Sequence, residues 1–263
     1  MLKFAKFHGT GNDFIMLDGR DLKSLPSSDE ISYMCNRHTG IGADGLIAIR
    51  PAEGFDFEMV YFNSDGSLAT MCGNGARCAA AFGHLAGMSG TVFSFLAGDG
   101  PHTGTLEQQA DNRWLVEISM SDIAIPDETG ERTAINTGTP HLVVISDDPD
   151  SVDVFSEGQR IRYSPPYAEK GINVNFVALG DDLLKVRTYE KGVEDETLSC
   201  GTGVTACAAI ATLKTGREAW KIETRGGMLE VSMTKKADKL TSVRLKGPAI
   251  RVFSGEIPYP AKV

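Results

Sequence analysis

Two cysteines in this chain of 263 residues stand immediately before a Gly-x-Gly sequence, and each is followed by an alanine-rich run. Cys72 begins the segment "CGNGARCAA", and Cys200, 128 residues later, begins "CGTGVTACAA". Glycine can adopt backbone conformations closed to larger residues and alanine favours helix, so each segment predicts a tight loop that leads into a helix. Each cysteine is therefore expected at a helix amino terminus.

That position has two chemical consequences. Unpaired N–H groups and the positive end of the helix dipole can bind a carboxylate, and they lower the pKa of a nearby thiol from its usual value of about 8.5. Two such thiols facing one ligand could invert an α-carbon, because a thiolate removes the proton from one face and a thiol returns a proton to the other. We therefore expect acid/base chemistry from Cys72 and Cys200, which would titrate as a coupled pair. Cys78 and Cys207 lie inside the alanine runs and are expected only to pack in the core.

Other segments recur at nearly the same offset as the two cysteines. "GTGN" from Gly9 matches "GTPH" from Gly138, and "GADGLIAI" from Gly42 matches "GINVNFVAL" from Gly171. Each half is predicted to run as strand, helix, strand, strand, glycine turn, helix and further strands. The sequence thus predicts an α/β (α+β) fold made of two similar domains, residues 1–120 and residues 121–263.

The junction between the domains is expected in the polar segment from Met120 to Thr133. The final "RVFSGEIPY" could return as a strand to either half. We expect strands at 55–62 and 183–190, which are rich in aromatic and β-branched residues. A helix capped by serine is expected from residue 27 to near Gly40, and antiparallel hairpins at 91–120 and 221–233.

Composition excludes several classes of protein. A formal net charge of −9, without a cluster of basic residues, argues against nucleic-acid binding. We find no stretch of apolar residues long enough to span a membrane and no secretory signal. Five cysteines suit reduced thiols in the cytoplasm, and the lack of a Cys-x-x-Cys pair, with scattered histidines, predicts no metal site. A cytoplasmic protein that binds neither nucleic acid nor membrane is therefore expected.

With these segments in place, the chain resembles the diaminopimelate epimerases, which are cofactor-independent amino-acid epimerases. The resemblance rests on eight segments in order: "FHGTGNDF", "NRHTGIGADG", "FNSDGS", "MCGNGARC", "TGTPH", "GINVNF", "YEKG" and "ETLSCGTGVTACA". It implies two domains, each a mixed, mostly antiparallel sheet wrapped around a central helix, with the active site in the interdomain cleft. It also implies a homodimer that converts the small-molecule substrate LL-diaminopimelate to the meso isomer, for lysine and peptidoglycan, without a cofactor such as pyridoxal phosphate.

The resemblance also implies a role for each matching residue. Cys72 and Cys200 would be the base and the acid, and His141 and Glu190 would lie beside them, assisting proton transfer or positioning the α-amino group. The residues that would hold substrate are Asn12, Gly73, Asn74, Gly201 and Thr202 around the reacting carboxylate, and Asn63 and Asn173 at the distal centre. Three positions depart from the common family residues and concern the distal pocket: Thr139 replaces a frequent Asn, Lys191 a usual Arg, and Gly45 an occasional Gln.

Two other functions are compatible with the cysteine pair. A related two-cysteine racemase or epimerase could act on proline or hydroxyproline, but that group typically has His after the first Cys-Gly, where this chain has Asn74. A non-catalytic binding protein or thiol redox sensor would instead use a readily formed Cys72–Cys200 disulfide. Loss of inversion on replacing either cysteine would separate a two-cysteine enzyme from the non-catalytic protein.

Overall fold

The computed structural model describes residues 1–258 and divides into two compact units. Unit 1 comprises Met1–Ile118 and the segment from Gly247 onward, and unit 2 comprises Ser119–Lys246. No helix among the described residues is long and apolar enough to cross a membrane.

The two units repeat one order of elements. The elements before the junction are β1 (Leu2–Gly9), β2 (Asn12–Asp18), a 3-10 turn (Gly19–Asp21), α1 (Ser28–Cys35), β3 (Gly45–Ala52), β4 (Phe55–Asn63), β5 (Leu68–Ala69), α2 (Gly73–Leu85), β6 (Val92–Ala97), β7 (Gly100–Ala110) and β8 (Arg113–Ser119). Those after it are β9 (Ile123–Ala124), β10 (Arg132–Asn136), β11 (Pro140–Ile145), a 3-10 turn (Pro149–Ser151), α3 (Val154–Arg162), β12 (Asn173–Leu179), β13 (Leu183–Glu190), β14 (Asp195–Thr197), α4 (Gly201–Thr215), β15 (Ala219–Thr224), β16 (Gly227–Lys235) and β17 (Lys239–Ile257). The predicted duplication is confirmed.

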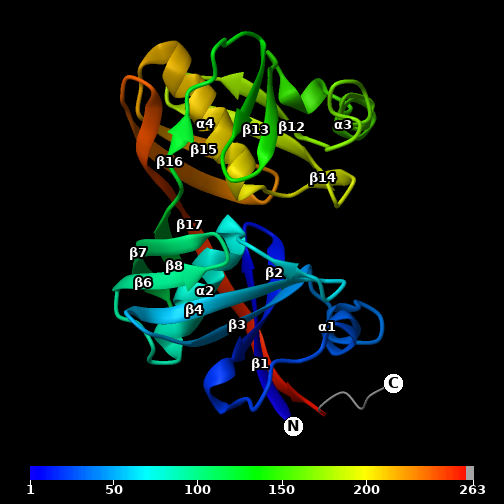
Figure 1. Ribbon diagram of the computed structural model, residues 1–263, viewed down its shortest axis with the longest axis vertical. Coiled ribbons are helices and arrows are strands. Elements are labelled where there is room, and N and C mark those ends of the chain that lie inside the picture. The colour runs from blue at the N-terminus through cyan, green and yellow to red at the C-terminus, as the bar shows by residue number, and fades with distance from the viewer. Residues whose placement is uncertain (259–263) are drawn as a thin grey trace. The chain divides into compact units, whose positions relative to one another are not determined.

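In unit 1 the strands close on themselves around α2 (Figure 1). The ladder runs β1–β2–β3–β4–β6–β7–β8–β17 and returns to β1, with parallel pairing only at β2–β3 and β4–β6. Closure gives each of these strands two hydrogen-bonded neighbours, which removes exposed edges. Helix α2 is buried along most of its length because its side chains are small enough to be surrounded by the sheet.

Unit 2 has the same plan around α4. Its ladder runs β10–β11–β12–β13–β15–β16–β17–β9, with parallel pairing at β11–β12 and β13–β15.

Strand β17 belongs to the sheets of both units. Its first residues pair with β16 and β9, whereas Gly247–Ile257 pair with β8 and β1. The terminal strand thus pairs with unit 1 from Gly247 onward. The expectation of a mixed sheet around a central helix in each half is confirmed.

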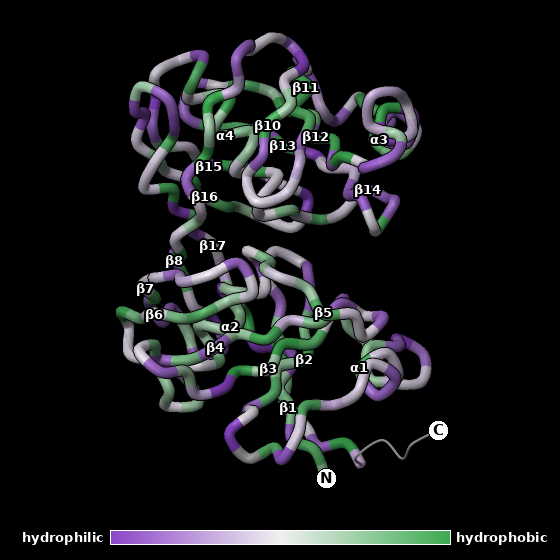
Figure 2. Tube along the Cα trace, in the orientation of Figure 1, coloured by the Kyte–Doolittle hydropathy of each residue, from purple (hydrophilic) through white to green (hydrophobic). Residues whose placement is uncertain are grey.

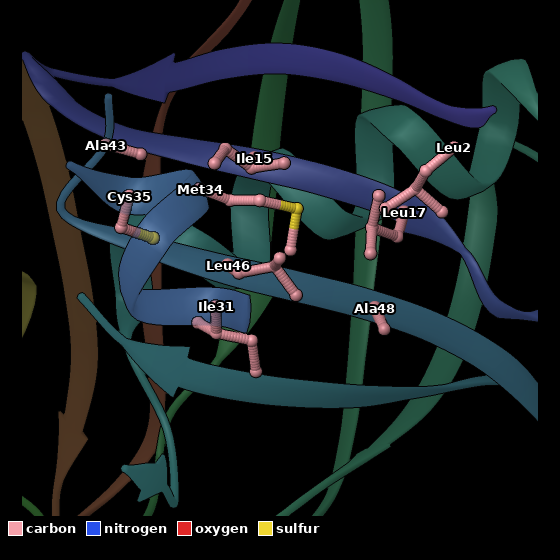
Figure 3. Packing of buried hydrophobic residues seen from close by; sticks show 9 residues of the cluster. All are labelled: Leu2, Ile15, Leu17, Ile31, Met34, Cys35, Ala43, Leu46 and Ala48. Carbon is pink, nitrogen blue, oxygen red and sulfur yellow. The ribbon is translucent and has the colours of Figure 1, made fainter. Parts of the chain in front are cut away.

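The outer helices bury one face each. Ile31 and Met34 of α1 pack with Ile15 and Leu46 of the neighbouring strands (Figure 3). Helix α3 buries Val154, Gly158 and Ile161, which share one face, and carries mostly hydrophilic residues elsewhere (Figure 2).

Helix α1 begins as expected at a Ser27 cap but stops at Cys35, several residues before the predicted end. The cause is Asn36, which has an extended backbone and accepts hydrogen bonds from the N–H groups of His38 and Thr39 through Oδ1. This local turn competes with the helix for the backbone donors.

Candidate active site

Cys72 is the N-cap residue of α2, as the sequence predicts, with extended backbone angles of φ −142° and ψ 120°. The N–H of Gly75 donates to its sulfur over 3.5 Å. Gly73 is the first helical residue, so its N–H belongs to the unpaired amide groups of the helix terminus. The loop therefore joins a sulfur to a positively polarised group of amides.

Two asparagines adjoin the Cys72 sulfur in unit 1. Oδ1 of Asn12 accepts from Nδ2 of Asn74 over 3.3 Å and lies 3.5 Å from Sγ of Cys72. Nδ2 of Asn12 donates to Oδ2 of Asp44 over 2.8 Å. Because a carboxylate only accepts, Asp44 fixes the orientation of the Asn12 amide and turns its oxygen toward the thiol.

Arg77 lies behind this group, on the second turn of α2. Its side chain is 0% exposed, and it donates to Oδ1 of Asn74 over 2.9 Å and to the carbonyl of Gly73 over 3.1 Å. A weaker contact of 3.4 Å reaches the hydroxyl of Thr10. Arg77 thus holds Gly73 and Asn74, the two residues that directly follow Cys72, through hydrogen bonds.

Cys200 is the N-cap residue of α4, also as predicted, and Gly201 begins the helix. Its sulfur lies 3.4 Å from the Oγ1 of Thr202. Thr202 therefore occupies the place that Asn74 has in the first loop, two residues after the cysteine. The backbone carbonyl of Thr202 accepts from the hydroxyl of Thr137 over 2.9 Å, which ties the loop to the strands of unit 2.

His141 contacts this second loop through Thr202. Its Nε2 lies 3.0 Å from Thr202 Oγ1 and 3.0 Å from Thr139 Oγ1. The ring is 0% exposed, and burial lowers the pKa of His141 to about 3, so it is neutral at physiological pH.

Asn175 fixes the tautomer of His141. Nδ2 of Asn175 donates to the carbonyl of Leu142 over 3.2 Å, which identifies that atom as the nitrogen, and it lies 3.1 Å from Nδ1 of His141. Its Oδ1 accepts from the hydroxyl of Thr188 over 2.9 Å. Nδ1 of the neutral ring is therefore an acceptor, and the ring proton is on Nε2, directed at the two threonine hydroxyls.

The residues expected at the distal centre come from both units and are described unit by unit. In unit 2, Nδ2 of Asn173 donates to Oγ1 of Thr139 over 3.4 Å, and its Oδ1 accepts from the N–H of Lys191 over 2.8 Å. The Lys191 side chain is exposed, and Glu190 ends β13 directly before it.

In unit 1, Asn63 ends β4 and donates through Nδ2 to Oγ of Ser67 over 3.0 Å. Its cross-strand partner is Gly45, the first residue of β3. A Cβ at Gly45 would lie 2.5 Å from the carbonyl oxygen of Phe62, so the backbones approach too closely there for a side chain.

The remaining cysteines of the two loops behave as predicted. Cys78 and Cys207 are fully buried, and burial raises the pKa of each thiol. No cluster of three or more His, Cys, Asp or Glu that could hold a metal ion occurs within residues 1–258. Each helix terminus thus presents a thiol, backbone amides and the side chain two residues after the cysteine, Asn74 at α2 and Thr202 at α4.

Comparison with known proteins decides the family. The family model described as diaminopimelate epimerase matches residues 4–121 and 133–252. The chain belongs to the diaminopimelate epimerase family. A diaminopimelate epimerase of Flavobacterium psychrophilum is 42% identical over 261 residues, covering 97% of this chain and 100% of that protein. Another, from Aquifex aeolicus, is 38% identical and covers 97% of this chain and 98% of that protein.

Solved structures share the family fold at much lower identity. A probable proline racemase from Agrobacterium radiobacter, crystallised with bound carbonate, has a TM-score of 0.72 at 13% identity, covering 98% of this chain and 93% of that one. This likeness concerns the fold alone. The expected mixed fold of the epimerases is thereby confirmed, and the chain is that of an isomerase family.

Four residues that contact the candidate site were not predicted from the sequence: Thr10, Asp44, Arg77 and Asn175. Arg77 carried a signal, since it is the one charged residue in the apolar run that follows Cys72. Asn175 carried another, because it lies two residues after Asn173 and alternate residues of a strand share a face. Asp44 and Thr10 acquire their roles only through hydrogen bonds distant in sequence.

Proposed function

We propose that the protein interconverts LL- and meso-diaminopimelate without a cofactor, using Cys72 and Cys200 as the two acid/base groups. The observation that carries the proposal is that both cysteines occupy the N-cap position of a buried helix, with a hydrogen-bonding side chain, Asn74 or Thr202, two residues later. One sulfur, as thiolate, takes the α-proton, and the other, as thiol, protonates the resulting carbanion on its opposite face. The product has the mirror configuration, and the two sulfurs have exchanged protonation states.

The α-carboxylate would be held by N–H groups at the two helix termini. Gly73 and Asn74 contribute from α2, and Gly201 and Thr202 from α4, where amide dipoles favour an anion. Asn12 supports the first loop through Asn74.

The neutral His141 would act through Thr202, whose hydroxyl it holds next to the Cys200 sulfur. Glu190 is assigned the α-amino group on the basis of the family resemblance, and Asn63, Thr139, Asn173 and Lys191 the distal centre. Lys191 would meet a distal carboxylate as a point charge, without the bidentate geometry of arginine. A cytoplasmic homodimer is the assembly that the resemblance implies.

The deciding experiment is incubation of the purified protein with LL-diaminopimelate in deuterated water, with no cofactor added. We expect the meso isomer carrying one deuterium at the inverted α-carbon, because the returning proton comes from a thiol equilibrated with solvent. The same assay with L-proline and trans-4-hydroxy-L-proline tests the related racemases. Turnover of either of these but not of diaminopimelate would reject the proposed substrate, and binding without deuterium incorporation would reject an epimerase altogether.

A further inference from the structure

Arg77 is a fully buried cation without an acidic partner. Its hydrogen bonds within residues 1–258 go to Asn74, Gly73, Thr10 and, at 3.4 Å, the carbonyl of Pro248, and all four acceptors are neutral. No carboxylate of residues 1–258 forms an ion pair with it. Burial lowers the pKa of Arg77 to about 10, so the guanidinium is charged at neutral pH. A buried charge is costly unless a negative group compensates it.

Four charged residues of unit 1, Lys6, Asp13, Arg37 and Asp44, pair with one another. Asp13 pairs with Lys6 at 2.7 Å and with Arg37 at 2.8 Å, and Arg37 also pairs with Asp44 at 2.7 Å. Burial alone would raise the pKa of Asp13, but the hydrogen bonds from Arg37 and Lys6 hold it well below its usual range. Two cations and two anions leave the charge of Arg77 uncompensated.

Two further titratable groups near the first loop cannot supply the negative charge. Cys78 is buried beside Arg77, and burial raises the pKa of its thiol, so it stays protonated. His8 accepts a hydrogen bond from the N–H of Gly11 and can only be neutral or positive, and burial lowers its pKa. Cys72, at the helix terminus, is the group of this loop that can become an anion.

The second loop has a neutral residue at the position of this cation. Thr205 occupies the position of Arg77, 128 residues later, and its hydroxyl donates to the carbonyl of Gly201 over 2.8 Å, as Arg77 donates to Gly73. Thr202 and the neutral His141, which adjoin Cys200, carry no charge. At this position the duplicated loops therefore share a hydrogen bond to the first helical glycine but differ by one positive charge.

We propose that Arg77 is a positioning residue that holds Cys72 as the resting thiolate, whereas Cys200 rests as the thiol. This inference rests on the proposed two-cysteine function. Asn12 opposes this stabilisation of the Cys72 thiolate, because its Oδ1 can accept a hydrogen bond only from the protonated thiol. The influence of Asn12 on Cys72 is weaker than that of Arg77, since a neutral amide dipole acts less strongly than a unit charge in the same buried region. Asn12 would instead stabilise Cys72 after it has taken the substrate proton.

The test is the pH profile of iodoacetamide alkylation at each cysteine, followed by mass spectrometry of the full-length protein after digestion. Only the thiolate reacts, so the midpoint of each profile reports ionisation independently of access. In the wild type, we expect a lower midpoint for Cys72 than for Cys200. Arg77→Met should raise the Cys72 midpoint by about one pH unit or more, which slows its alkylation at pH 7 about tenfold. Arg77→Lys should restore most of the wild-type profile.

Thr205→Val is the matched control, because it removes the corresponding hydrogen bond without removing a charge, and it should leave the Cys72 midpoint unchanged. A wild-type Cys200 midpoint below that of Cys72 would overturn the proposal even if Arg77→Met failed to fold. An unchanged Cys72 midpoint in a folded Arg77→Met protein would overturn it too. Because alkylation does not depend on turnover, these results are separate from failure of the epimerase assay.

Discussion

Asn175 lies with its Nδ2 atom 3.1 Å from Nδ1 of His141, and the carbonyl of Leu142 fixes which amide atom faces the ring. A buried, neutral imidazole consequently keeps its proton on Nε2, toward Thr202. The contact links a residue of β12 to the loop that carries Cys200. Four predictions follow from it and from the geometry of the two loops.

Removing the Asn175 amide should disturb the tautomer of His141. We expect Asn175→Ala to lower epimerase turnover about 10- to 100-fold, because Thr202 loses a fixed donor. Asn175→Asp should move the ring proton to Nδ1, which nitrogen NMR shifts of His141 report directly. The surface variant Asn112→Ala is the control. A wild-type spectrum with the proton already on Nδ1 would contradict the assigned network.

Each proposed acid/base thiol should be indispensable. Cys72→Ala and Cys200→Ala should each reduce inversion by at least about 1,000-fold, because one face of the α-carbon then lacks its proton donor or acceptor. Cys207→Ala, inside the helix that begins after Cys200, removes a core thiol that is 0% exposed and should retain turnover within a few-fold. The assay is chiral chromatography of diaminopimelate. Near-normal inversion by either alanine variant would exclude the two-base scheme.

The neutrality of His141 should make the protein sensitive to acid. Its pKa is about 3 in the folded state against about 6.5 when unfolded, so the unfolded chain binds the extra proton as the pH falls through this window. The free energy of unfolding should decrease by ~1.4 kcal/mol for each pH unit between about 6 and 3 on this account. In urea unfolding, the free energy of unfolding of His141→Gln should depend less steeply on pH than that of the wild type. The control His38→Gln, at an exposed histidine, should keep the wild-type slope. Equal slopes for His141→Gln and wild type would show that His141 is not buried in its neutral form.

Two helix glycines allow a matched test of packing around the loops. A Cβ at Gly203 would lie 2.4 Å from Oδ1 of Asn175, whereas one at Gly75 would meet the flexible Cδ1 of Ile47 at 2.7 Å. Gly203→Ala should lower the free energy of unfolding by about 1–3 kcal/mol, since Asn175 is held by its hydrogen bonds. Gly75→Ala should lower the free energy of unfolding by less. The gain in helix propensity from alanine, about 1 kcal/mol, is similar in the two variants. Urea unfolding measures the difference, and the reverse order would contradict the rigid placement of Asn175.

The sequence alone determined the duplicated fold and the location of both cysteines at helix amino termini. These features are local: glycine and alanine decide where a helix begins, and their repetition in register exposes the duplication. The membership of the family followed from motifs spread over both halves.

Only the tertiary structure decided which groups surround each sulfur. Arg77 meets Thr10 and Pro248, and Asn175 meets His141, because sheet pairing and burial bring together residues far apart in the chain. Strand pairing also decided where the last strand runs, which a short apolar segment leaves open. The loops are chemically alike in sequence, and the buried charge behind Cys72, absent at Thr205, distinguishes them only once the side chains are placed.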